Sequence, residues 1–305
     1  MTLTQLRYFL GIAAAGTMSG AARQIGIAQP ALSLQIAHLE AEFGQALFVR
    51  HGRGMTLTEV GQRLKGRAVE ILRQVELTRD ELSADSESPS GTVVVGMATS
   101  ANMAFSVDLL ISARRRFPRL KVQLVESMSG FLLEWVERGR IDMAVVYDVT
   151  PHATLSVERL ATENLYLIAS PGADAAVKPV VRFADLVAFP LIVPGKQHRL
   201  GQLIQQMAAT QKVALDIVAE VDSTYSIKKL VSRGEGYSIL SAHAVEEEIA
   251  RCELSAIPIA DPAITRSIDL IVNPLRKPNS SVKIIAKLIA EMVRTGPKRT
   301  DVTLV

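Results

Sequence analysis

Basic and hydrogen-bonding side chains gather in the first 58 residues of the chain. Residues 1–67 hold seven basic and three acidic side chains, a local charge of +4 in a chain whose overall formal charge is +3. Such a basic patch favours an anionic polymer. Arginine binds phosphate oxygens, whereas amide, hydroxyl and imidazole groups can read the edges of bases. The candidate DNA contacts are Ser19, Gln29, Pro30, Ala31, Ser33, Leu34, Gln35, His38, Arg50, Arg53 and Thr58.

Leu34 stands out among these positions because it is a large aliphatic side chain. Leu32, Ile36, Leu39 and Phe43 are spaced as one inward stripe of a helix, and at about 100° per residue Leu34 lies nearly opposite that stripe. A leucine there can pack on the methyl groups of thymine. It can equally be an ordinary exposed leucine, which is common on protein surfaces. Both interpretations stay open.

The sequence offers no catalytic or metal-binding pattern. G-x-S-x-G, G-x-x-x-x-G-K and G-x-G-x-x-G are missing, and the five histidines are scattered without metal-ligand spacing. Asp142 and Asp148 flank a predicted strand, where a structural role is commoner than an acid/base pair. We therefore expect no enzyme, no cofactor and no metal site.

The elements that position the candidate DNA contacts are three short helices and a hairpin. A first helix opens with Leu3 and ends at Gly16 and Thr17. Ser19 can cap a second helix that ends at Gly26. A third spans about 29–43 with Pro30 in its first turn. The stretch "LFVRHGRGMTLT" then predicts a small β-hairpin, or wing. This layout is typical of a winged helix-turn-helix, in which the second helix of the pair enters the major groove. An ordinary helical hairpin is the alternative.

A long helix follows the wing, from about residue 59 to 84. Thr56 or Thr58 can cap it, and Thr56 with Glu59 has capping-box spacing. One apolar stripe of this length, with a charged opposite face, usually pairs with another helix. The stripe has no obvious partner within a compact first domain, so it predicts a dimer seam with a second copy of the chain. The predicted dimer contacts are Leu64, Ala68, Ile71 and Val75.

From Thr92 onward, strand and helix patterns alternate, which predicts an α/β domain with mostly parallel strands. We expect a winged helix-turn-helix domain over 1–58, a linker and dimerisation helix over 59–88, and an α/β domain for effector binding and oligomerisation over 89–305. The last is long enough to form two lobes. Lobe 1 would comprise about 89–160 and 267–305, and lobe 2 about 161–266.

Composition indicates a folded protein without a membrane span. No apolar run reaches the roughly 18 residues that cross a bilayer. The start, Arg7 followed by "YFLGIAAAG", loosely resembles a signal peptide, but its leucines recur at helical spacing. The single cysteine, Cys252, cannot form an internal disulfide and is predicted to be a small buried residue. A cytoplasmic location is expected.

The segment "SGAARQIGIAQPALSLQIAHLEAEFGQALFVRHGRGMTLTEVG" closely resembles the amino-terminal signature of LysR-type transcriptional regulators. "IDMAVVYD" and "LVSRGEGYSIL" extend the likeness along the chain, and the wording of "IDMAVVYD" and "IAQPALS" is most similar to nitrogen assimilation control regulators. The resemblance implies a two-lobed second domain like that of periplasmic binding proteins. Many family members carry arginine or another polar residue at the position of Leu34, so base reading by this helix would differ here.

The resemblance also implies a cleft for a small-molecule effector between the lobes. Hydroxylated helix starts after strands favour an anion such as a carboxylate, although plain helix capping explains each start singly. The candidate effector-binding residues are Thr99, Ser100, Met128, Ser129, Tyr147, Pro194, Lys196, Ser223 and Thr224.

The predicted function is a DNA-binding transcriptional regulator that binds a partly palindromic promoter site. Its partners would be double-stranded DNA and further copies of itself, as a dimer of dimers, with RNA polymerase as a candidate and no membrane. The alternatives are a LysR-type regulator that needs no effector, a solute-binding protein with a helical appendage, and an enzyme.

Overall fold

A computed structural model describes the whole chain except residues 53, 83–88, 177, 275–279, 296–301 and 305. The chain forms two compact units, Met1–Ser86 (unit 1) and Glu87–Val305 (unit 2). Among the described residues, no helix is both long and apolar enough to cross a membrane.

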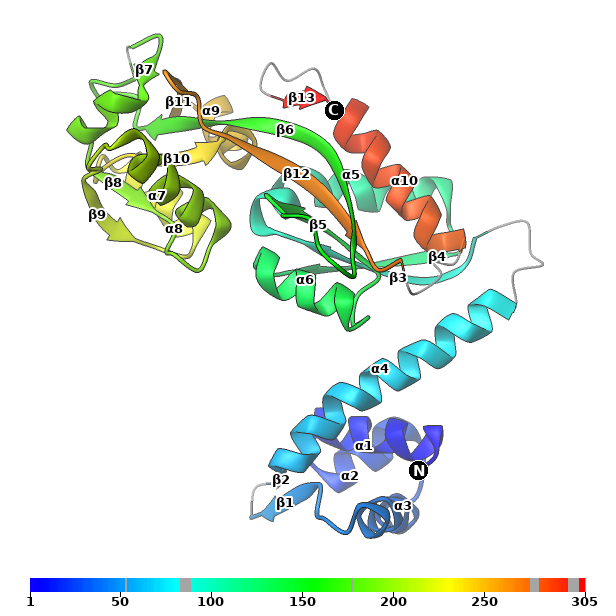
Figure 1. Cartoon of the computed structure of the whole chain (residues 1–305). Helices are drawn as coiled ribbons and strands as arrows, with labels where there is room; N and C mark the ends of the chain where they lie inside the picture. Colours follow the sequence, from blue (N-terminus) through cyan, green and yellow to red (C-terminus); the bar gives the residue numbers. More distant parts are fainter. Residues whose placement is uncertain (53, 83–88, 177, 275–279, 296–301, 305) are drawn as a thin grey trace. The chain divides into compact units, whose positions relative to one another are not determined.

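The described residues of unit 1 form four helices and a two-stranded hairpin (Figure 1). Its elements are α1 (Leu3–Ala15), α2 (Met18–Ile25), α3 (Gln29–Phe43), β1 (Phe48–His51), β2 (Gly54–Leu57) and α4 (Glu59–Leu82). Helices α1, α2 and α3 each end at a glycine in the left-handed conformation, which a residue without a Cβ adopts at little cost: Gly16, Gly26 and Gly44.

One helix cap differs from the predicted residue, and at a second helix one of the two predicted candidates forms the cap. Thr17, not Ser19, caps α2, because its hydroxyl accepts a hydrogen bond from Gly20 N at 3.1 Å, whereas Ser19 lies inside the helix. Thr58 caps α4 through Gly61 N at 3.0 Å, whereas the Thr56 hydroxyl bonds the His51 ring. In both cases the residue directly before the first helical position takes the cap, since only there does the backbone leave the helix.

The wing is joined to the helices by its backbone. Strands β1 and β2 pair antiparallel, with Arg50 opposite Met55. Met55 N donates to Gly16 O at 2.7 Å, and Gly54 lies so close to this carbonyl that a Cβ there would come within 2.6 Å of the oxygen. The wing is therefore anchored to the α1–α2 turn.

The core of unit 1 contains the first half of α4, which corrects the predicted dimer seam. Ala68 is fully buried in the same cluster as Leu6, Phe9 and Leu32, and Leu64 and Ile71 pack against that cluster. These residues therefore have a partner within their own chain, namely the helices of the winged domain. Phe43, expected in the inward stripe of α3, is 40% exposed because it lies at the last helical position, beyond the packed turns.

Unit 2 is built on a mixed, nine-stranded sheet in the order β4-β3-β5-β12-β6-β11-β7, in which β10 and β13 also pair with β6. The strands are β3 (Gly91–Met97), β4 (Leu120–Glu126), β5 (Met143–Tyr147), β6 (Ser156–Ala169), β7 (Val181–Arg182), β10 (Ser238–Ser241), β11 (Ser255–Ala260), β12 (Thr265–Val272) and β13 (Val302–Leu304). A separate parallel pair joins β8 (Leu191–Val193) to β9 (Ile217–Glu220).

The expectation of mostly parallel strands is wrong for the middle of this sheet. Strand β3 runs parallel to β4 and β5, but β12 pairs antiparallel with both β5 and β6. The long β6 and β12 run side by side from one group of elements to the other (Figure 1), and strands that carry the chain out and back must be antiparallel.

Two hydrophobic cores lie at either end of this strand pair. One core uses residues between Val93 and Ala161 together with Ile268 to Val293, and the other uses residues between Leu165 and Ile264. The helices of the first are α5 (Thr99–Arg116), α6 (Ser129–Glu137) and α10 (Ser280–Thr295). The second is covered by α7 (Arg199–Gln211) and α8 (Thr224–Ser232), with 3-10 turns at Phe183–Ala188 and Ala242–Val245 and the short α9 (Glu246–Ala250) beside it.

Candidate DNA-binding and effector sites

Helix α3 presents one outward face in unit 1. Leu32, Ile36 and Leu39 bury the inner face, so the residues between them point away from the core. Leu34 is 55% exposed. Gln29, Pro30, Ala31 and His38 are exposed as well, and Ser33 and Gln35 are half-buried. The structure therefore brings the predicted α3 contacts onto one side of one helix.

Gln35 is held by a residue that the sequence patterns did not identify. The Gln5 side chain is buried, and its Nε2 donates to Gln35 Oε1 at 3.3 Å. Gln5 is fixed in turn by Thr2, whose N donates to Gln5 Oε1 at 2.8 Å in a capping box. This arrangement leaves the Gln35 amide group as the outward donor. The signal was the Thr2-x-x-Gln5 spacing, which predicts a cap but not the contact with α3.

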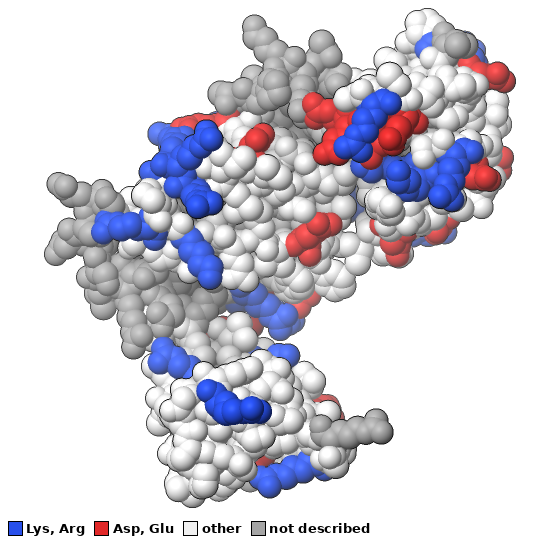
Figure 2. Space-filling view, turned by 180° about the vertical axis from the view of Figure 1, so that it is seen from behind, with Lys and Arg blue, Asp and Glu red and all other residues white. Residues whose placement is uncertain are grey.

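The wing presents one exposed arginine among its described residues. Arg50 is exposed on β1, and Ser19 is exposed on α2. Arg53 lies outside the described residues. On the face drawn in Figure 2, unit 1 carries several separate groups of Lys and Arg and very little Asp or Glu.

Thr58 has a structural role that the prediction of a DNA contact did not include. Its hydroxyl donates to Ala46 O at 2.8 Å and accepts from Gly61 N at 3.0 Å. It therefore joins the start of α4 to the segment before β1. Because the hydroxyl hydrogen of Thr58 is already donated to Ala46 O, it is not available to a phosphate oxygen.

In unit 2, the predicted effector residues lie at the carboxyl ends of parallel strands. Helix α5 begins at Thr99 directly after β3, α6 begins at Ser129 with Met128 as its N-cap, and Tyr147 ends β5. Pro194 follows β8, and Ser223 caps α8 after β9 through Ser226 N at 3.3 Å. Lys196 is exposed, whereas Ser129, Tyr147 and Pro194 are buried.

Contacts show which of these strand ends meet. Ala98 N donates to Val145 O at 3.0 Å and Ser127 N to Met97 O at 3.3 Å, which places the ends of β3, β4 and β5 together. Arg199, the first residue of α7, donates from Nη2 to the carbonyl oxygen of Asp148. The end of β5 therefore touches the helix that follows β8, and this contact joins the two core regions.

A buried charged network crosses the same boundary, and sequence reasoning missed it. Arg266 on β12 and Glu163 on β6 form an ion pair with Nε–Oε1 2.5 Å, and both side chains are buried. Arg266 also donates to Ser241 Oγ at 3.4 Å, and its guanidinium lies 3.7 Å from the centre of the Tyr147 ring. The partners lie 103 residues apart in sequence, so no local pattern reveals them.

Ionisation at this network follows from burial. Burial raises the pKa of the Tyr147 phenol well above its usual range, Glu163 raises it further, and the hydrogen bond with Ser100 acts in the opposite direction. Burial likewise raises the pKa of Asp148, although the hydrogen bond from Ser267 N lowers it. Tyr147 is therefore a neutral group at neutral pH.

Metal ligation finds no support among the described residues, where no cluster of three His, Cys, Asp or Glu side chains could hold an ion. Cys252, predicted to be buried, is exposed. It lies in the turn after α9 with a left-handed φ of 56°, a position outside the packed core.

Comparison with protein families finds two matches. Residues 3–62 match the model described as "Bacterial regulatory helix-turn-helix protein, lysR family", and residues 86–294 match the model "LysR substrate binding domain".

Curated relatives are similar over nearly the whole chain. The HTH-type transcriptional regulator BbuR of Bordetella bronchiseptica is 30% identical over 95% of this chain and 89% of its own length. The nitrogen assimilation regulatory protein nac of Klebsiella aerogenes is 27% identical, covering 96% of this chain and 95% of that protein.

Solved structures share the fold. CbnR, crystallised at full length with its target DNA, superposes with a TM-score of 0.75 at 22% identity, covering 97% of this chain and 100% of that chain. A full-length variant of OxyR from Pseudomonas aeruginosa gives 0.72 at 21% identity over 96% and 98% of the two chains.

Proposed function

Because the chain belongs to the LysR family of transcriptional regulators, we propose that the outward face of α3, together with the wing, binds a partly palindromic promoter site. The family assignment excludes the two alternatives from other classes, an enzyme and a solute-binding protein with a helical appendage. One observation carries the proposal of this surface: every predicted contact on α3 is exposed or half-buried, whereas Leu32, Ile36 and Leu39 form a buried stripe.

The side chains of this surface fall into two groups, one suited to base edges and one suited to phosphate. Gln29, Ser33, Gln35 and His38 carry groups that can hydrogen-bond base edges. Arg50 on the wing binds phosphate and contributes no sequence preference of its own. Leu34 lies in the middle of the polar set, where a thymine methyl would cover it.

Replacing Arg50 by alanine is expected to weaken binding to operator and unrelated DNA alike. Because the variant loses one phosphate contact, the negative slope of log affinity against log salt should become less steep by about 0.9. The measurement is fluorescence anisotropy with the full-length protein at several salt concentrations. Arg114→Ala is the control, because Arg114 is an exposed arginine of unit 2. An Arg50 variant with the unchanged salt slope would remove the wing from the proposed surface.

Replacing Leu34 by serine is expected to cost about 1 kcal/mol or more of discrimination at one or two base pairs, with little change in binding to unrelated DNA. The physical reason is the lost contact with a thymine methyl group. Operator DNA with uracil in place of thymine should reproduce the loss in the wild-type protein. If uracil has no effect at any position of the site, Leu34 is simply an exposed leucine.

A partly palindromic site calls for two DNA-binding units, and we propose that α4 joins them. The part of α4 beyond the packed turns projects past the other helices of unit 1 (Figure 1) and contains Val75. Val69 is 40% exposed on the outer side of the same helix. These residues replace Leu64, Ala68 and Ile71 in the proposed seam. We also propose that two such dimers associate, that the protein contacts RNA polymerase, and that it acts in the cytoplasm.

We further propose that a small anion, such as a carboxylate, modulates DNA binding from the strand ends of unit 2. Helix starts at Thr99 and Ser129 offer backbone N–H groups to negative charge, and Lys196 adds a cation. A ligand shifts the arrangement of the lobes only by the difference in its affinity for two arrangements. In this proposal the chain responds through three parts: a DNA-binding domain over 1–58, a linker helix over 59–88 and an effector domain over 89–305. The effector domain has one lobe near 89–160 and 267–305 and a second lobe near 161–266.

A further inference from the structure

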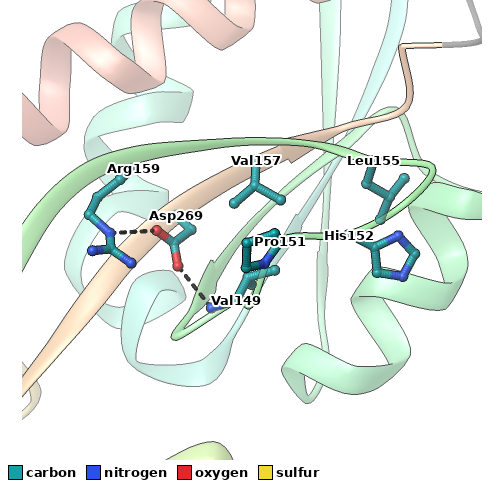
Figure 3. Close-up of a pocket in the computed structure, with 7 residues that line it drawn as sticks. All are labelled: Val149, Pro151, His152, Leu155, Val157, Arg159 and Asp269. Carbon is teal, nitrogen blue, oxygen red and sulfur yellow. Dashed lines mark hydrogen bonds and ion pairs between the residues drawn. The ribbon is translucent and has the colours of Figure 1, made fainter.

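A pocket of unit 2, of about 400 Å³, is lined by residues other than those of the strand ends described above. It is lined by Val149, Pro151, His152, Leu155, Val157, Arg159 and Asp269 (Figure 3). The segment between β5 and β6 forms one wall, and the adjacent strands β6 and β12 form the other. None of these seven residues belongs to the predicted effector set.

One side of the pocket is apolar. Pro151 is exposed and Val157 is half-buried, whereas Val149 and Leu155 are buried and reach the pocket with a small part of their side chains. Figure 3 shows these aliphatic side chains on the stretch from Arg159 to His152. Aliphatic walls with a few polar groups at defined points are typical of small-molecule sites. The pocket therefore has room and surface for an apolar body several carbons long.

The charged end is a guanidinium held in place by a buried carboxylate. Asp269 is 1% exposed, and its Oδ2 accepts from Val149 N at 2.9 Å and from Ser267 Oγ at 2.6 Å. Its Oδ1 receives Arg159 Nε at 3.5 Å. The oxygens of Asp269 are thus engaged within the protein, which leaves little capacity for a ligand.

Arg159 has capacity to spare. Its side chain is 54% exposed. Among the described residues, its Nε bonds Asp269, and no contact is seen for its two terminal nitrogens. The two terminal nitrogens, each with two N–H donors, match the spacing of two carboxylate oxygens. Because Asp269 fixes the Nε side, the fork is partly preorganised.

We propose that this pocket binds a small amphipathic carboxylate, with the carboxylate on Arg159 and the apolar body against Val157, Pro151 and Leu155. A cationic ligand would be repelled by the positive charge of Arg159, and a neutral ligand would gain only the contact with the aliphatic side chains. The proposal concerns unit 2 alone and is independent of DNA binding and of the effector site at the strand ends.

The same hydrogen bonds connect the pocket to the boundary between the two cores. Ser267 Oγ donates to Asp269, and Ser267 N donates to Asp148 Oδ1 at 2.9 Å. The carbonyl oxygen of Asp148 accepts from Arg199 on α7. A carboxylate bound to the terminal nitrogens of Arg159 therefore shares its guanidinium with Asp269, which lies two hydrogen bonds from Asp148 and its contact with α7.

The test is a ligand-observed NMR titration of the full-length protein with hexanoate, alongside hexylamine and 1-hexanol as probes of the same length. Hexanoate is expected to bind more tightly than either of the other two. Arg159→Gln should raise the Kd for hexanoate by about tenfold or more, because a charge-assisted fork is lost. Arg159→Lys should give a smaller increase, since it keeps the charge without the fork.

The control is Ser100→Ala, which alters the strand-end site but leaves the Arg159 pocket intact. It should leave the Kd for hexanoate unchanged. A loss of hexanoate binding in Ser100→Ala would assign the ligand to the strand-end site and overturn the proposal. Binding that survives Arg159→Gln, or hexanoate binding no tighter than 1-hexanol, would overturn it too. Loss of DNA binding in a separate experiment would count against the proposed function and leave this pocket unaffected.

Discussion

Replacing Ala68 by glutamate is expected to unfold the DNA-binding unit and abolish operator binding. Ala68 is fully buried in the core that α4 shares with the first three helices. A glutamate there would overfill the core and place a charge where no cation can pair with it, at a cost of about 4 kcal/mol or more. Hydrogen exchange of peptides from residues 3–43 in the full-length protein is the measurement, because it reports on unit 1 separately.

Val69→Glu is the matched control, since it introduces the same side chain one residue further along the same helix. Val69 is 40% exposed, so the fold of unit 1 should be retained. If the proposed α4 seam is correct, this variant should associate less well while remaining folded. An Ala68→Glu protein that keeps the exchange protection of residues 3–43 and loses only its dimers would restore Ala68 to the seam.

Replacing Glu163 by alanine is expected to lower the free energy of unfolding of unit 2 by about 3–5 kcal/mol. The substitution leaves Arg266 buried beside Tyr147 without its carboxylate. An unpaired buried charge is far costlier than the loss of the pair's mutual attraction. Urea unfolding followed by tryptophan fluorescence measures this, because the chain's single tryptophan, Trp135, packs against a core of unit 2.

Two further variants make the Glu163 result specific. Glu158→Ala breaks a solvent-exposed pair on the same strand, in which Arg294 Nη2 lies 2.9 Å from Glu158 Oε1, and should cost at most about 1 kcal/mol. Glu163→Leu combined with Arg266→Met removes both buried charges and should recover most of the lost stability. A Glu163→Ala protein no less stable than Glu158→Ala would mean that water reaches Arg266 and that the buried ion pair does not stabilise the pairing of β6 with β12.

Several local features of unit 1 could be predicted from the sequence because nearby residues determine them. Pro30 in the first turn and Gly44 at the end delimit α3 as Gln29–Phe43, as predicted. The spacing of Leu32, Ile36 and Leu39 gave its buried side, and hence the exposure of Leu34. Helix ends and apolar periodicity depend on backbone conformation within one or two turns, so they can be read without the rest of the chain.

The tertiary structure alone decided which partner covers each apolar stripe. The stripe of α4 looked unpartnered, yet its first half packs on helices formed some 50 residues earlier in the chain. Burial depends on which distant segments fold back onto a surface, and the period of a stripe carries no information about that choice.

The candidate site divides in the same way. Residues on α3 could be assigned to one face from their spacing, and the helix starts at Thr99, Ser129 and Thr224 could be located from the alternation of strands and helices. The sequence by itself thus determined the family, the outward face of α3 and the order of the elements, because these are properties of neighbouring residues. Only the tertiary structure paired Glu163 with Arg266 and Arg159 with Asp269, since these partners, more than 100 residues apart in sequence, meet where β6 and β12 lie side by side.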